Sequence, residues 1–373
     1  MENFTRGGIG RIECLTSLRG IAIFTIFLSH LSFWGETKFN VVKDVFSYAR
    51  LGVDFFFLLS GFLIAAQYSE KFNEKTITYV SFVKKRIQRM YPLYIVIILL
   101  CVPNYLYLNF KAHTLSAVDF AIRLVTSVFM VQAAIPFGDF SRSFAGAGAT
   151  WFISCIFILY LITPILLKLN NRIKNNLRRL LTSIFVNVFL FIFVYSGFHY
   201  LEYVRFPDSD LFLVYSTPYI RIFFYVGGIL IFDLYKLLKR YLMDRFDNFS
   251  FCEVILAIGA VSWWLSGNVL PIPVVLGEVF NLCLASLIIF VYSFERGLCS
   301  KRLKSKCLLK FGNISMEFYL IHYTLINIGY RILSNYIETS VTAAIVYSII
   351  FFVLTVVLAK YAHEITDRFL RKN

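Results

Sequence analysis

The sequence predicts an all-α membrane protein that crosses the bilayer about ten times, with both termini in the cytoplasm. Of its 373 residues, 58% are hydrophobic and only 16% are charged, well below the roughly 25% charged residues of soluble domains. The apolar runs are much longer than the roughly 10-residue strands of a membrane barrel. Helices are then the structure that satisfies every backbone group in hydrocarbon. The net charge of +15 comes from short loops between these runs, which is typical of cytoplasmic loops and does not indicate nucleic-acid binding.

Ten apolar runs approach or exceed the length that a helix needs to cross a membrane, about 20 residues. We expect them at 15–34, 51–69, 92–108, 151–167, 181–198, 214–235, 251–268, 273–293, 314–334 and 340–361. With ten crossings, the basic clusters at 71–89, 168–179, 236–245 and 296–310 all lie on the cytoplasmic side, as the positive-inside rule requires.

The segment 117–134 is also apolar, but one more crossing there places the basic residues 168–179 outside the cell. We therefore expect a helix that lies at the outer face of the membrane or dips into it. The chain shows no repeat, low-complexity stretch or appended soluble region, so a single membrane-embedded domain over 1–373 is predicted. Its seven cysteines show no metal-binding spacing, and no metal site is expected.

Two ionisable residues lie within the first apolar run, Arg19 and His30. Eleven residues of helix turn about 20° past three full turns and rise ~16 Å, so both side chains share one face. Ionisable groups in a span usually face a protein interior or a wet cavity. The alternative is structural: Arg19 reaches the cytoplasmic headgroups, and His30 is a hydrogen-bonded core histidine.

Asp54 opens the second run, in the stretch GVDFFFLLSGFLI. The first run passes outward and the second inward, so His30 and Asp54 both fall in the outer half and are expected to meet. A carboxylate on one imidazole nitrogen leaves the other nitrogen as a base. Alternatively, Asp54 is the N-cap of its helix.

The stretch FVKKRIQRMYPLY places Arg86 and Arg89 three residues apart, and therefore on one helical face. The planar guanidinium is well suited to phosphate. The alternatives are ordinary positive-inside charge and contact with anionic lipids.

These motifs, in this order, resemble the acyltransferase type 3 family of bacterial membrane proteins, which acylate sugars of surface polysaccharides and other glycoconjugates. Two later stretches add to the resemblance, TWFISCIFILYLITPIL and FGNISMEFYLIHYTLI. They supply Trp151 and Tyr160, and then Ser315 and His322. At position 156 many members have Glu, whereas this chain has Ile156. Met316 and Glu317 depart from the usual Tyr-Ser.

The resemblance implies an O-acetyltransferase of the bacterial inner membrane that moves acetyl from acetyl-CoA to a sugar hydroxyl of a lipid-linked or surface glycan such as an O-antigen. Its implied partners are acyl-CoA, the glycan and membrane lipids. The implied roles fall into three groups. His30 and Asp54 are catalytic. Arg19, Arg86 and Arg89 bind the donor. Trp151, Tyr160, Ser315 and His322 contact substrate.

Two alternative functions are also considered. A transporter or flippase of lipid-linked sugars belongs to another class, but such proteins often show paired, Gly- or Pro-broken spans in related halves, and no such pairing is seen here. Transfer of another acyl group, such as succinyl, is kept open by Ile156. A covalent acyl intermediate on Cys155 is disfavoured, because a buried cysteine usually acts as a small hydrophobe.

Overall fold

The computed structural model describes residues 11–31, 50–135, 144, 147–205, 212–266, 272–337 and 340–372, and these contain helices and connecting turns but no β-strand. The helices are α1 (Glu13–Ser29), α3 (Arg50–Asn73), α4 (Tyr79–Lys111), α5 (Ala117–Val128), the 3₁₀ turn η2 (Gln132–Ala134), α6 (Thr150–Asn170), α7 (Leu177–Arg205), α8 (Phe212–Tyr215), α9 (Pro218–Arg245), α10 (Ser250–Ser266), α11 (Val274–Tyr292), α12 (Leu298–Leu303), α13 (Lys306–Asn313), α14 (Ser315–Ile337) and α15 (Val341–Lys372).

The predicted helical class is confirmed. Within the described ranges, six helices are long and apolar enough to cross a membrane: α3, α4, α6, α7, α11 and α15. The other four predicted runs are also helical, as α1, α9, α10 and α14. The last residues of two predicted runs, 32–34 and 267–268, lie outside the described residues.

Helix α5 covers the first part of the ambiguous segment 117–134. It has 12 residues, which at 1.5 Å each is about 18 Å, too short for a hydrocarbon core of about 30 Å. Ser116 caps its first turn by accepting a hydrogen bond from the backbone N–H of Asp119. An ion pair between Asp119 and Arg123, at 2.8 Å, stabilises the same turn. The helix then ends at Val128 and is followed by η2, as expected of a segment that does not cross.

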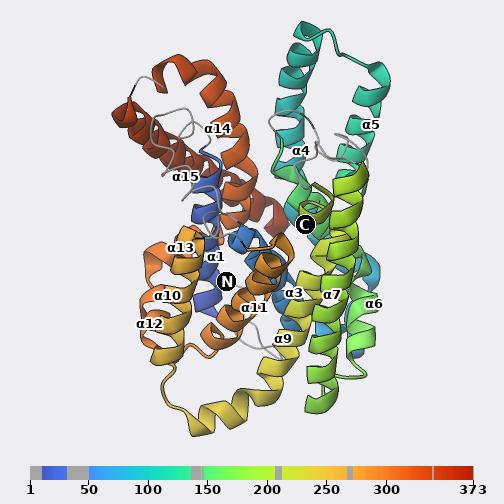
Figure 1. The fold of residues 1–373 in the computed structure, drawn as a ribbon, viewed down its shortest axis with the longest axis vertical. Coiled ribbons are helices and arrows are strands. Elements are labelled where there is room, and N and C mark those ends of the chain that lie inside the picture. Colours follow the sequence, from blue (N-terminus) through green and yellow to red (C-terminus); the bar gives the residue numbers. More distant parts are fainter. Residues whose placement is uncertain are drawn as a thin grey trace.

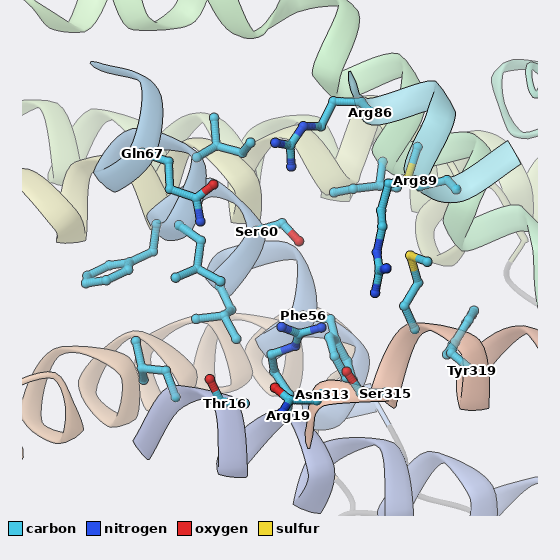
Figure 2. A pocket seen from close by; sticks show the side chains of 18 of the residues that line it. Thr16, Arg19, Phe56, Ser60, Gln67, Arg86, Arg89, Asn313, Ser315 and Tyr319 are labelled. Atoms are coloured by element: carbon cyan, nitrogen blue, oxygen red, sulfur yellow. The ribbon is translucent and has the colours of Figure 1, made fainter. Parts of the chain in front are cut away.

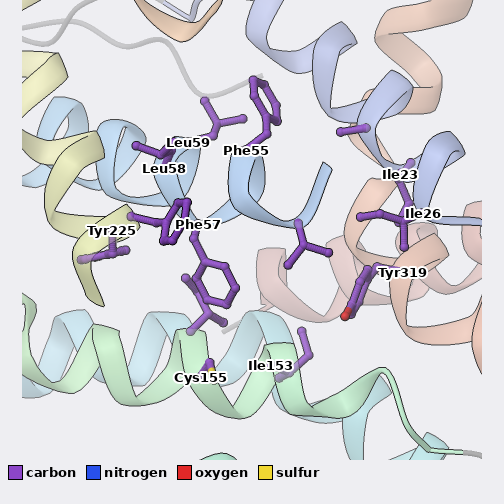
Figure 3. Close-up of a cluster of buried hydrophobic side chains, with 14 of the residues drawn as sticks. Ile23, Ile26, Phe55, Phe57, Leu58, Leu59, Ile153, Cys155, Tyr225 and Tyr319 are labelled. Atoms are coloured by element: carbon purple, nitrogen blue, oxygen red, sulfur yellow. The ribbon is translucent and has the colours of Figure 1, made fainter. Parts of the chain in front are cut away.

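The most extensive packing between two helices joins α3 to α9 (Figure 1). A Cβ atom at Gly61 would collide with the carbonyl of Tyr225, and one at Gly228 with the carbonyl of Leu58. Small residues let membrane helices approach closely, and here they set the two backbones against each other. Figure 3 shows the side chains beside this crossing, with Leu58 and Phe57 on α3 and Tyr225 on α9.

Helix α1 lies in the middle of the bundle, packed against α3, α13 and α14 (Figure 1). A Cβ at Gly52 of α3 would lie 3.1 Å from the carbonyl of Ala22, and a Cβ at Gly312 would collide with that of Thr16. These two glycines hold α1 tightly on two sides. They therefore fix where two side chains project: Arg19, in the first half of α1, and His30, which follows its last residue.

Candidate active site

A cavity of about 580 Å³ opens among helices α1, α3, α4, α6, α14 and α15. Five of the residues predicted from sequence to bind donor or substrate line it: Arg19, Arg86, Arg89, Tyr160 and Ser315. Figure 2 shows Arg86 and Arg89 entering from α4, and Arg19 entering from α1 on the opposite wall. Residues far apart in the sequence thus place three guanidinium groups around one space.

Arg86 is held by aromatic rings. Its guanidinium carbon lies 5.0 Å from the ring centre of Tyr68, 5.7 Å from that of Phe82 and 5.8 Å from that of Tyr160. It also donates a hydrogen bond to the Tyr68 hydroxyl. The buried Nε atom has no hydrogen-bond partner among the described residues. Cation–π contacts orient the group without neutralising it, so its positive charge stays available to an anion.

Arg89 is held by carboxylates. One terminal nitrogen lies 2.9 Å from Glu317 and the other 2.9 Å from Asp367. His363 lies between the two acids, with its Nδ1 3.0 Å from Glu317 and 3.2 Å from Arg89. This group joins α4 to α14 and α15, and His363 and Asp367 line the cavity.

Three further features complete the cavity. Arg11 lies at its edge and donates a hydrogen bond to Asn313. The buried hydroxyl of Ser315 has no hydrogen-bond partner among the described residues, so it is available to a ligand. Ile156, at the position where related proteins often carry Glu, is part of the apolar wall together with Ile153.

The two predicted histidines meet. Nε2 of His322, on α14, lies 3.2 Å from Nδ1 of His30, at the end of α1. Tyr319, one turn before His322, lines the cavity, and its ring centre lies 5.6 Å from that of His322 and 4.9 Å from that of Phe152. The histidine pair therefore lies one helical turn beyond the wall of the cavity.

The hydrogen-bond partners assign the protons of this pair. Nδ1 of His322 lies 2.7 Å from the carbonyl oxygen of Tyr319, and Nδ1 of His30 lies 2.8 Å from that of Ile26. A carbonyl oxygen only accepts hydrogen bonds, so both Nδ1 atoms carry a proton. The one Nδ1–H of His30 is then shared between the nearer Ile26 carbonyl and Nε2 of His322, which accepts at 3.2 Å. The Nε2 atom of His30 keeps its lone pair, which is what a general base requires.

The structure differs from the expected contact between His30 and Asp54. The Asp54 carboxylate forms an ion pair with Arg221 of α9, and its second oxygen accepts a hydrogen bond from Asn281 at 2.9 Å. The geometry of α3 explains the difference. Gly52 faces α1, and a residue two positions later points about 200° around the helix, away from α1. Asp54 is not an N-cap either, because α3 begins four residues earlier, at Arg50.

Trp151 also lies outside the cavity-lining set. The guanidinium carbon of Arg221 lies 5.9 Å from the ring centre of Trp151 and 4.8 Å from that of Tyr215. Cys155 donates to the carbonyl of Ser216 at 3.2 Å. The thiol is fully buried and directed at a backbone atom, which does not favour an acyl-cysteine.

Sequence analysis missed four residues that the structure brings to these sites. Arg221 lies inside an apolar run, where a buried cation needs a carboxylate, and Asp54 is the acid of another run; that signal predicts their pairing. Glu317 lies inside another apolar run, where a carboxylate likewise needs a cation, but Arg89 and His363 lie outside the apolar runs and carry no such signal. Asp367 lies near the end of a helix among other charged residues, and nothing in the sequence distinguishes it.

Comparison with known proteins places this arrangement in context. The model of a family described as an acyltransferase domain, Acyl_transf_3, matches residues 12–360. The chain is 24% identical over 334 residues to "Acyltransferase MdmB" of Streptomyces mycarofaciens, covering 87% of this chain and 81% of that protein. It is also 38% identical over 86 residues to "Protein 2 in picA locus" of Rhizobium radiobacter, covering 23% of this chain and 41% of that protein. No solved structure matches the chain.

Proposed function

Because this chain belongs to the acyltransferase type 3 family, we propose that it is an O-acetyltransferase that moves acetyl from acetyl-CoA to a sugar hydroxyl of a surface polysaccharide or lipid-linked glycan. The observation that carries this proposal is one arrangement. A cavity lined by several arginines lies one helical turn of α14 from a histidine pair, in which Nδ1 of His30 contacts a backbone carbonyl and Nε2 is left as the candidate base.

The arginines suit the donor. Coenzyme A carries phosphates, which Arg binds through several directed donors. Among the described residues no ion pair compensates the charge of Arg86, and Arg19 faces it across the cavity (Figure 2). The rise of α1 from Arg19 to His30 is ~16 Å, comparable to an extended pantetheine arm. A thioester anchored at the arginines therefore reaches toward the histidine pair.

The histidines suit the chemical step. Nε2 of His30 removes the proton of the acceptor hydroxyl, and the oxygen attacks the thioester carbonyl. As the carbon–sulfur bond breaks, the imidazolium returns the proton to the leaving thiolate. General base catalysis of this kind contributes typically 10²–10⁴-fold, and holding both reactants in place adds to it. His322 supports the reaction by accepting a hydrogen bond from the same Nδ1–H of His30 that faces the Ile26 carbonyl, which helps to keep this proton on Nδ1.

The proposed topology follows from the same helices. Ten crossings with both termini in the cytoplasm put the ends of α4 and α6 that carry Arg86 and Lys168 on the inner face. The donor cavity then opens toward cytoplasmic acetyl-CoA, and His30 lies in the outer half. A bacterial inner membrane is the compartment that offers both acetyl-CoA and lipid-linked glycans.

The test is acetyl transfer in membranes that contain the protein, with labelled acetyl-CoA as donor and mass spectrometry of the surface glycans of cells with and without the gene. Label should reach a glycan hydroxyl only when the gene is intact, and succinyl-CoA should not replace acetyl-CoA. Identical glycans in both strains would refute the proposal.

A further inference from the structure

Arg89 differs from the other arginines of the cavity because its charge is already compensated. Two carboxylates, Glu317 and Asp367, each lie 2.9 Å from one of its terminal nitrogens. The two acids outnumber the one guanidinium, so Arg89 in this arrangement adds no net positive charge to the cavity.

The two carboxylates differ in their access to water. The Glu317 side chain is 0% exposed, whereas that of Asp367 is 41% exposed. Removing Glu317 from Arg89 leaves an unpaired charge in the interior, which is costly. Asp367 can turn into solvent, where a carboxylate is hydrated and an exposed ion pair contributes little. Of the two contacts, the one with Asp367 is therefore the one that a ligand can replace.

The position of Asp367 also allows an entering anion to replace it on Arg89. It lines the cavity together with His363 and Arg89, so an anion that enters meets the same guanidinium edge. A phosphate group carries up to two negative charges and presents three oxygens. It therefore binds Arg89 more strongly than a half-exposed carboxylate does. The ring of His363, with Nε2 3.5 Å from Asp367, remains on Glu317 when Asp367 leaves.

We propose that Asp367 is a displaceable counter-ion of the donor site: it neutralises Arg89 until a donor phosphate replaces it, while the buried Glu317 keeps Arg89 in position. This inference rests on the proposed function, because the phosphate is that of acyl-CoA. It makes α15 part of the donor site, and it makes donor affinity the outcome of competition between two anions for one arginine.

The experiment is calorimetric titration of the whole protein in lipid nanodiscs with coenzyme A, and separately with pantetheine, which lacks the phosphates. Asp367→Asn should lower the Kd for coenzyme A at least threefold, because the competing charge is gone. The Kd for pantetheine should not change. Asp367→Ser also removes the charge, with a smaller side chain, and should show the same two results. It replaces the Asn variant if that variant does not fold.

Glu364→Gln is the matched control. It removes the same charge from the exposed surface of the same helix, so a general electrostatic effect would tighten binding equally in both variants. Equal tightening, unchanged affinity or weaker binding in the Asp367 variants would each overturn the counter-ion role. Wild-type protein that binds no coenzyme A would instead refute the proposed function, and this inference with it.

Discussion

His322 accepts a hydrogen bond from His30 over 3.2 Å, and each ring also holds a backbone carbonyl through its Nδ1 atom. The two helices that contribute these residues are far apart in the sequence, so the contact exists only in the folded bundle. The Ile26 carbonyl, which only accepts, assigns the proton of His30 to Nδ1 and leaves the lone pair on Nε2. The side-chain contact with His30 that sequence analysis expected from Asp54 is made in the structure by His322.

The first prediction concerns His30. His30→Gln keeps much of the size of the ring but cannot take up a proton near neutral pH, so acetyl transfer should fall by about 10²–10⁴-fold. Acidification should slow the wild-type enzyme for the same reason, because a protonated imidazole is no base. Coenzyme A binding should persist, since Arg19, Arg86 and Arg89 line the cavity and His30 does not. Near-normal transfer per folded molecule by the Gln variant would exclude the base role.

A second prediction separates His322 from His30. Because His322 acts through Nε2 as an acceptor, His322→Gln should retain more activity than His322→Ala; the amide oxygen can accept the same proton. The KM for donor should be unchanged in both. The measurement is the transfer rate across pH in purified membranes. Equal loss in the two variants would argue that the ring itself contacts substrate.

Arg86 carries the third prediction. Arg86→Ala removes a charged donor worth roughly 1.5–3 kcal/mol, so coenzyme A affinity should fall about tenfold to a hundredfold. Arg86→Lys should recover only part of it, because an ammonium lacks the planar fork that stacks on Tyr68 and Tyr160. Lys84→Ala, on the exposed side of the same helix, is the control. Unchanged affinity in Arg86→Ala would mean that Arg86 does not bind the donor and serves only as positive-inside charge.

The buried pair of Asp54 and Arg221 leads to a prediction about stability. Both side chains are 0% exposed, and removing one partner of such a pair typically costs about 3–5 kcal/mol. Asp54→Asn should therefore reduce the amount of folded protein, measured by thermal unfolding, more than the turnover of the molecules that fold. Adding Arg221→Gln should restore part of the loss, as the orphaned charge is removed. A normal Tm with low turnover would instead favour a direct catalytic role.

Labelling of intact cells with a membrane-impermeant maleimide tests the topology. The exposed native Cys307 lies in a basic region that ten crossings place inside, so it should not react. A Thr114→Cys variant, at the exposed turn between α4 and α5, should react. Labelling of Cys307 from outside would contradict the ten-crossing arrangement.

Helix positions were predictable because hydropathy is a property of each run by itself. Arg19, Arg86, Tyr160 and Ser315 were each selected from sequence motifs, and the structure brings all four to one cavity. Contacts between runs were not predictable in the same way. Whether Asp54 faces α1 or α9 depends on the rotation of α3, and that rotation is set by Gly61 against Gly228, which periodicity alone does not reveal.

The cavity is bounded by Arg11 and Ile12 at one end of the described chain and by His363 and Asp367 near the other. During synthesis, Arg11 and Ile12 leave the ribosome long before His363 and Asp367 do. A nascent chain with α1 to α14 already inserted still lacks the side that carries Asp367. The proposed donor site is therefore incomplete until α15 has entered the membrane.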